Sequence, residues 1–516
     1  MGSILALLAT CLGLLVVSTS WRILNWVWLK PKQLEKELRK QGFSGNRYRL
    51  LFGDMKESSK MSKEAFSSPI EISDDIVPRV QPYTHRTVNK FGKKSFVWFG
   101  PVPCINIMEP HLIKEVMIKY EEFQKPNVNP LAKMIVKGLV ALEGQRWAKH
   151  RKIVNPAFHL EKLKALQGEF YISCNEMVRK WEEMMSSSGS CELDVWHHLD
   201  NLSGDVISRA AFGSSYKQGK KIFQLQKEQI TIAMKVLHQV YIPGLRFLPT
   251  KTNKRMKEIN NEMRVLMNNV ISKRENQMKM GETCNDDLLG ILLESSMKAV
   301  EEDGNKMNGG LSIDEVVEEC KDFYLAGRDT TSCLLVWMMV MLGNHLDWQA
   351  RARDEVLRVF GNNKPDFNGL NNLKVMTMIM YEVLRLYPPV ILMYRMTHKP
   401  TKVGDILLPP GVQICVPTML LHTDPELWGE DATKFNPQRF SQGIAKVTNG
   451  QVIYIPFSGG PRVCVGQNFA LLEVKMAFAI ILQRYSFQLS PSYSHAPFLL
   501  TSLQPQYGVP IILQKL

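Results

Sequence analysis

Residues 457–466, Phe-Ser-Gly-Gly-Pro-Arg-Val-Cys-Val-Gly, place Cys464 at the end of a loop rich in glycine and proline. The pattern from Gln467 onward is typical of a helix, so the cysteine should precede a helix N-terminus. Amide N–H groups and the helix dipole stabilise a thiolate in such a position and lower its pKa. Because the thiolate is the reactive form of cysteine, the loop indicates a cysteine with a chemical role. A buried, inert cysteine in an ordinary turn is the alternative.

A second group of reactive side chains interrupts a long predicted helix. Ser312 and Glu315 form a capping box, and no proline follows before Asn344, which predicts a helix long enough to cross the whole domain. Its middle, residues 326–331, reads Ala-Gly-Arg-Asp-Thr-Thr. These residue types are unfavourable in a helix interior, so we expect a functional kink there.

The elements that must position these residues are mostly helical. Residues 109–390 favour helices, and strand-like segments occur at 95–99, 104–108, 390–416 and 497–513. We therefore expect one large, mainly α domain with a small β region assembled from distant parts of the chain.

The N-terminal segment is apolar, and the first charged residue is Arg22. A helix over residues 1–21 would span roughly 30 Å, the thickness of the hydrocarbon core of a bilayer. A cleaved signal peptide is the alternative, but the basic residues follow the apolar run and none precedes it. We expect a transmembrane signal-anchor at 1–24, a basic linker and interfacial segment at 25–60, and a catalytic domain at 61–516. This domain should lie on the cytosolic side of the endoplasmic reticulum membrane, as part of a single-pass protein.

Composition narrows the possible partners. The formal net charge is +14, but basic residues are interleaved with acids, which argues against nucleic acid and favours membrane lipid or an acidic protein. No two of the nine cysteines lie two to four residues apart, which excludes zinc-type pairs. Unpaired thiols favour a reducing compartment.

Four motifs in the same order resemble the cytochrome P450 superfamily of haem-thiolate monooxygenases. Residues 457–466 match F-x-x-G-x-R-x-C-x-G at every fixed position, and residues 326–331 resemble the oxygen-binding groove A-G-x-[DE]-T-[TS]. Residues 382–385 resemble the E-x-x-R pair, and residues 435–440 the segment whose arginine completes its network, with Gln438 where Glu is frequent. The resemblance implies the cytochrome P450 fold, haem b as cofactor and Cys464 as axial ligand of the iron. It also implies a structural network of three residues, Glu382, Arg385 and Arg439.

Further roles follow from the same resemblance. Thr330 is expected to hydrogen-bond dioxygen, the co-substrate, and Asp329 to relay protons. Four residues are expected to bind the cofactor, most of them through its propionates: Trp147, Arg151, Arg395 and Arg462. Forked, charge-assisted hydrogen bonds suit arginine to that task, although a solvated basic helix face also accounts for Arg151.

Within the superfamily, residues 149–158, 286–290 and 503–508 resemble a plant subfamily that contains secologanin synthase and oleanane triterpenoid oxidases. This resemblance implies oxidation of a C–H position of a terpenoid, with an oleanane triterpenoid expected and an iridoid or diterpenoid as alternatives. The substrate pocket would include the loop 127–139 and apolar residues that are equally consistent with ordinary core: Leu131, Phe323, Ala326, Val390, Met393 and Val509.

Electrons would come from NADPH through a flavoprotein, NADPH–cytochrome reductase. The basic residues Arg146, Lys149 and Lys152 would border the face that meets it. Three other classes compete with a monooxygenase: a haem-thiolate isomerase or dehydratase, a haem sensor or electron carrier, and a basic membrane protein without haem. Asp329 and Thr330 argue against the first of these, and the Cys464 loop against the last.

Overall fold

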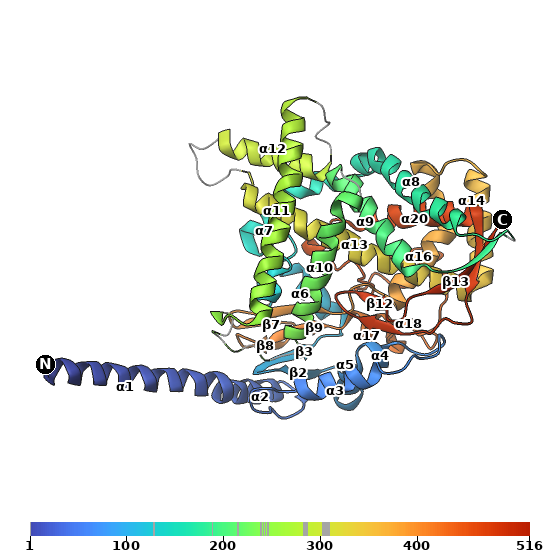
Figure 1. Ribbon diagram of the computed structural model, residues 1–516. Coiled ribbons are helices and arrows are strands. Elements are labelled where there is room, and N and C mark those ends of the chain that lie inside the picture. The colour runs from blue at the N-terminus through green and yellow to red at the C-terminus, as the bar shows by residue number, and fades with distance from the viewer. Residues whose placement is uncertain are drawn as a thin grey trace.

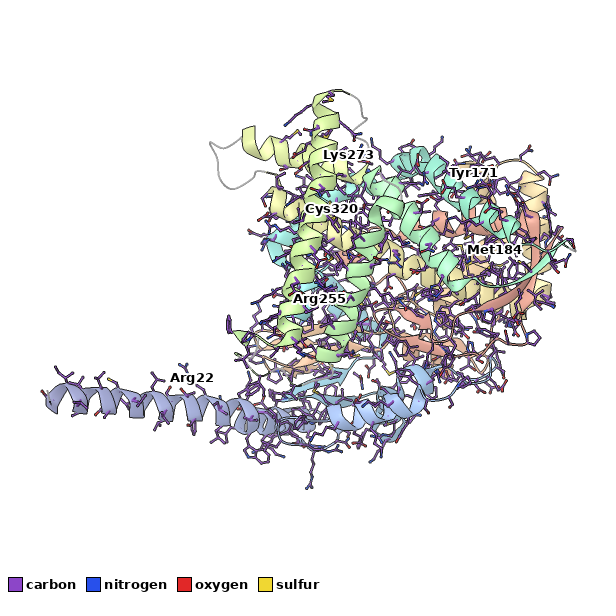
Figure 2. All side chains as sticks on the ribbon, viewed as in Figure 1. Arg22, Tyr171, Met184, Arg255, Lys273 and Cys320 are labelled. Atoms are coloured by element: carbon purple, nitrogen blue, oxygen red, sulfur yellow. The ribbon has the colours of Figure 1, made fainter. Side chains whose placement is uncertain are left out.

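The N-terminal helix projects away from a body built mainly of helices, as the computed structural model shows (Figure 1). The structure describes residues 2–126, 130–187, 189–213, 216–237, 240, 242, 244, 247–281, 287–301 and 310–516. A continuous helical segment, Gly2–Lys40, is apolar enough to cross a membrane, and none of its apolar window is buried. Figure 2 shows Arg22 on this projecting helix. An N-terminal apolar helix of this kind fits the predicted membrane anchor.

The body contains the following helices, in chain order after α1 (Gly2–Leu24): α2 (Lys30–Lys40), α3 (Met55–Ala65), α4 (Val77–Val80), α5 (Pro82–Phe91), α6 (Pro110–Ile118), α7 (Gly144–Val154), α8 (Leu160–Glu183), α9 (Trp196–Phe212), α10 (Tyr216–Leu237), α11 (Lys251–Lys279), α12 (Leu288–Glu301), α13 (Ile313–Asn344), α14 (Leu346–Phe360), α15 (Phe367–Asn372), α16 (Lys374–Leu386), α17 (Thr418–His422), α18 (Pro425–Trp428), α19 (Ile444–Val447) and α20 (Gln467–Arg484). A π-helical turn, η1 (Asn25–Leu29), joins α1 to α2, and short 3-10 turns include η2 (Ala132–Met134), η3 (Asn155–Phe158), η5 (Pro437–Phe440) and η6 (Gly460–Arg462).

The β region consists of small sheets whose strands come from distant parts of the chain. The strands are β1 (Ser44–Gly45), β2 (Ser95–Phe99), β3 (Val102–Asn106), β4 (Phe123–Gln124), β5 (Ser190–Asp194), β6 (Met393–Thr397), β7 (Thr401–Val403), β8 (Ile406–Leu408), β9 (Gln413–Val416), β10 (Tyr485–Leu489), β11 (Pro497–Leu499), β12 (Leu503–Pro505) and β13 (Pro510–Lys515). The largest sheet has the order β1-β2-β3-β9-β6-β4, and the others are β10-β13-β5, β11-β12 and β7-β8. The predicted hairpin at 95–108 is the antiparallel pair β2–β3, in which Phe96 faces Ile105. The predicted fold class, mainly α with a small β region, is confirmed.

The long helix α13 runs through the body as predicted. The capping box forms, since Ser312 Oγ accepts the N–H of Glu315 and the Glu315 side chain accepts the N–H of Ser312. Unlike the N-terminal helix, α13 is 67% buried over its apolar window, so its apolar character reflects the protein core.

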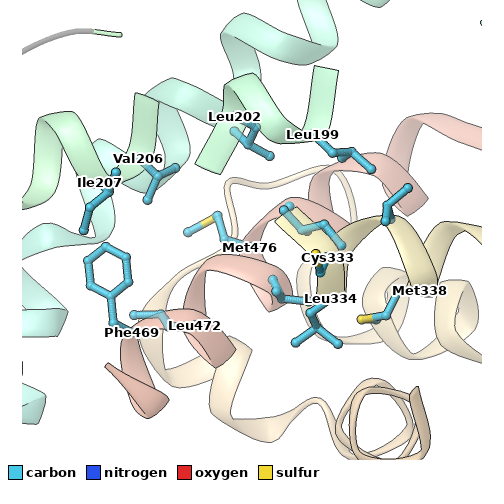
Figure 3. Packing of buried hydrophobic residues seen from close by; sticks show 14 of the residues in the cluster. Leu199, Leu202, Val206, Ile207, Cys333, Leu334, Met338, Phe469, Leu472 and Met476 are labelled. Atoms are coloured by element: carbon cyan, nitrogen blue, oxygen red, sulfur yellow. The ribbon is translucent and has the colours of Figure 1, made fainter. Parts of the chain in front are cut away.

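The core around α13 is shared with α9 and α20 (Figure 3). Leu202 and Ile207 of α9 pack in the same buried cluster as Leu334 of α13 and Phe469 of α20. A Cβ at Gly327 would lie 2.7 Å from two side-chain carbons of Ile207, so α9 approaches α13 closely only because this residue is glycine.

The segment predicted as a linker, residues 25–60, is more ordered than that description suggests. Helix α1 passes through η1 into α2 without interruption, and Leu34 and Leu38 of α2 are buried against the largest sheet with Phe96 and Trp98. The projecting helix is therefore anchored in the body at its C-terminal end.

Candidate active site beneath the long helix

A cavity of about 380 Å³ lies between α13 and the loop that carries Cys464. This volume falls within the usual range of small-molecule and cofactor sites, ~300–1,000 Å³. Helix α13 contributes a stripe of residues that repeat at helical spacing: Asp322, Phe323, Ala326, Gly327, Thr330, Thr331 and Leu334. The opposite wall comes from residues 455–458, 462–466 and 469–470.

Backbone geometry presents Cys464 to this cavity. The N–H of Cys464 donates to the carbonyl of Phe457 at 2.9 Å, which closes the loop before α20 begins at Gln467. Gly460 has φ +62°, and a Cβ there would lie 2.8 Å from the carbonyl oxygen of Met117. The glycine-rich sequence of the loop is thus required by a left-handed turn and by close contact with α6.

The protonation of Cys464 differs from the sequence-based expectation. Its sulfur is accessible from the cavity, but protein surrounds it on the other sides, and this burial raises the pKa of the thiol. A hydrogen bond from the backbone of Gly466 and the charge of Arg151 act in the opposite direction without overcoming burial. The expected lowering of the pKa by the loop alone is wrong; deprotonation of a coordinating thiol comes from the metal.

Basic side chains gather at one end of the cavity. Arg462 pairs with Glu143, donates to the carbonyl of Leu142 at 2.8 Å and lies over the ring of Trp147 at 4.0 Å from its centroid. Arg151 donates to the carbonyl of Val463 at 2.7 Å. Arg395 also lines the cavity, and burial lowers its pKa. The structure therefore brings together the four predicted cofactor-binding residues.

Lys125 belongs to the same basic group, although the sequence carries no motif for it. It follows the short strand β4, lines the cavity and lies near Arg462 and Arg395. Burial, together with the charges of these two arginines, lowers the pKa of Lys125 to about 8. These half-buried cations outnumber the carboxyl groups of Glu143 and Asp322 beside them, so the cluster suits an anionic ligand.

The side chains around the cavity fit a haem. Within the described ranges, no group of three or more His, Cys, Asp or Glu side chains is placed to hold a metal ion. A lone thiolate suffices for a haem, because the nitrogens of the porphyrin bind the iron and the protein need supply only one further ligand. Cysteine is a known protein ligand of haem iron. The basic cluster then suits the propionates, while the apolar residues Phe323, Leu334 and Val465 suit the ring.

Asp329 and Thr330 face different surroundings. Thr330 lines the cavity, and its hydroxyl donates to the carbonyl of Ala326 at 2.7 Å. Asp329 lines a separate crevice of about 40 Å³, where it accepts hydrogen bonds from Thr501 Oγ1 at 2.6 Å and Gln504 Nε2 at 2.8 Å. Burial raises the pKa of Asp329. Their predicted roles with dioxygen and protons stay predictions.

The predicted network of Glu382, Arg385 and Arg439 forms under the cavity, next to the Cys464 loop. Arg385 makes a forked pair with Glu382, Nε–Oε2 2.8 Å and Nη2–Oε1 2.7 Å, and both side chains are fully buried. Arg439 reaches Glu382 Oε1 at 3.4 Å and Asp431 Oδ2 at 2.9 Å.

His422 extends this network to the Cys464 loop and was not anticipated from the sequence. Its Nδ1 donates to the carbonyl of Arg385 at 3.1 Å, and its Nε2 accepts the N–H of Ile455 at 2.9 Å. Those bonds require the neutral imidazole with the proton on Nδ1. Burial and the charge of Arg385 lower the pKa of His422 to about 3.

Four of the predicted substrate-contact residues line the cavity: Phe323, Ala326, Val390 and Met393. Val509 does not, which corrects that prediction. Its side chain is fully buried in the main core, and its N–H donates to Asp194 Oδ1 at 2.7 Å. Leu131 is also absent from the cavity lining, and residues 127–129 of the predicted loop lie outside the described residues.

A mainly helical body that encloses a cavity between one long helix and a cysteine-bearing loop is the arrangement of a haem-thiolate protein. The family model described as Cytochrome P450 matches residues 77–510, and the chain belongs to this family. It is a cytochrome P450 monooxygenase.

Its relatives are plant enzymes. The chain is 56% identical over 507 residues to "Cytochrome P450 CYP72A219" of Panax ginseng, with 98% of each chain covered. It is 52% identical over 500 residues to 7-deoxyloganic acid hydroxylase of Catharanthus roseus, with 96% of each chain covered. It is 50% identical to secologanin synthase 1 of the same plant over 518 residues, which covers 100% of this chain and 99% of the relative. The solved structure of the retinoic acid-bound cyanobacterial CYP120A1 has the same fold, with TM-score 0.72 at 22% identity over 84% of this chain and 94% of that one.

The buried imidazole of His422 predicts a specific loss of stability in acid. Because the folded-state pKa of about 3 lies below the usual value of 6.5, the unfolded chain takes up a proton that the folded chain does not. Stability is lost progressively as the pH falls from 6.5 toward 3, by up to about 1.4 kcal/mol per pH unit. His422→Gln should therefore be less stable than the parent at pH 7, and this deficit should shrink as the pH is lowered.

Thermal unfolding followed by circular dichroism between pH 7 and pH 5 measures this difference. His398→Gln, a change at an exposed histidine, is the control and should follow the parent curve. A deficit for His422→Gln that stays constant over this range would contradict the neutral, buried imidazole.

Proposed function

We propose that the chain hydroxylates or further oxidises a C–H position of a plant terpenoid, and that its substrate is an oleanane-type triterpenoid. The observation that carries this proposal is the apolar wall of the cavity on the side of α13, formed by Phe323, Ala326 and Leu334 with Val390 and Met393 opposite. A rigid apolar skeleton suits such a wall. High identity to plant relatives over nearly the whole chain supports a substrate from plant metabolism.

The residues of the cavity divide the work among them. Bound haem supplies the activation of dioxygen, to which thiolate ligation contributes electron density. Cys464 would hold the iron. The propionates would be held by Trp147 and by the cations of Arg151, Arg395, Arg462 and Lys125. Thr330 would hydrogen-bond dioxygen from the cavity side of α13, and Asp329, which lies in the separate crevice with Thr501 and Gln504, would relay the proton.

A smaller, acidic substrate is the second candidate. The relatives named 7-deoxyloganic acid hydroxylase and secologanin synthase 1 favour an iridoid, and Lys125 could pair with the carboxylate of one. A diterpenoid is a further alternative of intermediate size. The compound that the protein converts distinguishes between these candidates.

Substrate conversion tests the function directly. Microsomes that contain the protein and a plant reductase are supplied with NADPH and, separately, with the oleanane β-amyrin, the iridoids 7-deoxyloganic acid and loganin, and a gibberellin. Mass spectrometry should detect a product heavier by one oxygen atom from the oleanane. Cys464→Ser should abolish both this product and the red-shifted Soret band of the ferrous carbon monoxide complex, since that band requires a thiolate ligand.

If only the iridoids are converted, the substrate is an iridoid and the triterpenoid proposal is wrong. A normal carbon monoxide spectrum in Cys464→Ser would remove Cys464 from its role as ligand. Both outcomes are distinguishable from misfolding by the circular dichroism spectrum of the variant.

We propose that this chemistry occurs at the cytosolic face of the endoplasmic reticulum membrane, and an N-terminal anchor supports this proposal. The unburied apolar segment within Gly2–Lys40 spans the bilayer once, and the basic residues that follow it mark the cytosolic side. NADPH–cytochrome reductase then supplies electrons from the face bordered by α7, the helix that carries Trp147 and Arg151. On this helix Lys152 is exposed, Lys149 donates to the carbonyl of Gly310 at 2.7 Å, and Arg146 pairs with Glu315 at 3.3 Å.

Charge reversal on α7 tests the docking of the reductase. The double change Lys149→Glu and Lys152→Glu should slow reductase-supported turnover several-fold, because an acidic partner surface would be repelled. Turnover driven by hydrogen peroxide needs no partner and should stay near the parental value. Product formation under the two electron supplies is the measurement.

The matched control reverses the same number of charges on α8, at the exposed residues Arg179 and Lys180, and should leave both activities near the parental values. Equal losses in both assays for the α7 variant would show damage to the cofactor site. No loss in either assay would show that these lysines do not take part in reductase docking.

A further inference from the structure

Asp322 carries a carboxyl group in a part of the cavity wall that also contains the apolar residues Leu139 and Phe323 and the basic Lys125. It lies four residues before Ala326 and eight before Thr330, so the three share one face of α13, and all line the cavity. At a rise of about 1.5 Å per residue, Asp322 is roughly 6 Å along the helix axis from Ala326 and roughly 12 Å from Thr330. The carboxyl group therefore marks one end of the cavity, and the proposed oxygen-binding residue lies well away from it.

The carboxyl group of Asp322 has unused hydrogen-bonding capacity. Its side chain is 2% exposed, and Oδ1 accepts the N–H of Lys137 at 3.2 Å. Among the described residues, Oδ2 accepts no hydrogen bond of good geometry, while the backbone N–H groups of Lys137 and Val140 both act on the carboxyl group. An unsatisfied buried oxygen costs stability, and the neighbouring wall residues Leu139 and Phe323 are apolar. Folding alone would favour an apolar side chain here, so the carboxyl group requires a functional explanation.

Burial favours the neutral form of this carboxyl group, and the charge of Glu319 acts in the same direction, while that of Lys321 opposes it. Glu319 is fully buried one turn away and is held by His150, Nδ1–Oε1 2.5 Å. Lys321 directs its ammonium group to Asn260 and Glu318, at 3.1 and 2.7 Å, and Lys125 donates to the carbonyl of Val140. Burial, with the nearby charge of Glu319, raises the pKa of Asp322 to about 8. At neutral pH the group is therefore mostly a carboxylic acid, which both donates and accepts hydrogen bonds.

We propose that Asp322 determines specificity by hydrogen-bonding an uncharged oxygen substituent, a hydroxyl or a carbonyl, at the end of the substrate remote from the oxidised carbon. This inference rests on the proposed oxidation of a terpenoid and adds a polar requirement to it. A neutral acid pairs with an alcohol or ketone oxygen in both directions, while the buried negative charge of Glu319 opposes a carboxylate. The separation between Asp322 and Thr330 favours a long, rigid skeleton over a small iridoid.

The test uses probes that bind the iron directly and do not depend on the identity of the substrate. 1-Alkylimidazoles with chains of six to ten carbons, each with and without a terminal hydroxyl, coordinate a haem iron through the imidazole and extend the chain into the cavity. Their dissociation constants come from the shift of the Soret band in the haem-loaded parent, Asp322→Leu and Asp322→Asn proteins. The hydroxyl preference is the dissociation constant of the plain probe divided by that of the hydroxyl probe of the same length. At one or more chain lengths, this ratio should be about tenfold larger for the parent than for Asp322→Leu, which is the effect of one hydrogen bond. Asp322→Asn should retain most of that preference, because an amide both donates and accepts.

Val390→Ala is the matched control, since it changes the cavity wall without changing its polarity, and it should shift the affinities for both members of a pair alike. If Asp322→Leu and the parent show the same hydroxyl preference at every chain length, the proposal is overturned. Equal weakening of both members of each pair, with a lower melting temperature, would also overturn it and would assign Asp322 to holding the backbone at Lys137. Failure to convert an oleanane in microsomes would contradict the triterpenoid proposal but would not affect the hydroxyl preference measured with the imidazole probes.

Discussion

The buried guanidinium group of Arg385 connects more of the active site than any other side chain described above. Its forked pair with Glu382 leaves N–H groups that donate to the carbonyls of His422 at 2.8 Å and Lys434 at 3.1 Å, and to that of Ala432. Glu382 in turn accepts the N–H of Asn436 at 2.8 Å. Two buried charges are expensive to desolvate, and removing one partner of such a pair costs about 3–5 kcal/mol. The pair is therefore better understood as a clamp on irregular backbone than as a source of stability.

The clamp matters because the chain between α17 and α20 has little regular structure of its own. Only short helical turns lie between His422 and Gln467, and this stretch ends in the loop that presents Cys464. Arg385 holds the beginning of this stretch through the carbonyl of His422. The imidazole of His422 in turn accepts the N–H of Ile455. Ile455 lies two residues before Phe457, whose carbonyl accepts the N–H of Cys464 and closes the cysteine loop. The distance between the cysteine and α13, and hence the space for cofactor and substrate, depends on this chain of contacts.

Charged side chains and apolar side chains occupy different parts of the cavity. The cations of Arg151, Arg395, Arg462 and Lys125 gather near the loop, where the propionates of a haem would lie. The stripe on α13 is apolar at Phe323, Ala326 and Leu334, with Asp322 at one end and the hydroxyl residues Thr330 and Thr331 before Leu334. Asp329 is kept outside, bonded to the turn between β11 and β12. The structure thus provides separate surroundings for the three proposed roles: holding the cofactor, orienting the substrate and moving a proton.

Features encoded in short sequence motifs were predictable, whereas those that depend on distant contacts were not. The Cys464 loop, the capping box at Ser312 and the Glu382–Arg385 pair each lie within ten consecutive residues, so spacing alone reveals them. Lys125 and His422 gain their roles from partners far along the chain, and no local pattern marks either residue. Val509 was misplaced for a similar reason: its apolar character fits a pocket or a core, and only the packing of β5 and β13 decides between them. The pKa of Cys464 was misjudged because burial by the surrounding fold outweighs the local helix terminus.

Hydrogen–deuterium exchange in an Arg385→Lys protein tests most directly whether this buried clamp positions the cysteine loop. Lysine keeps the charge but cannot make the forked pair with Glu382 or reach the three carbonyls together. Exchange should increase in residues 422–439 and 454–466, together with loss of bound haem, while α8 and the buried half of α13 keep their parental rates. Unchanged exchange in the cysteine loop, or an equal increase over the whole molecule, would contradict the positioning role of Arg385.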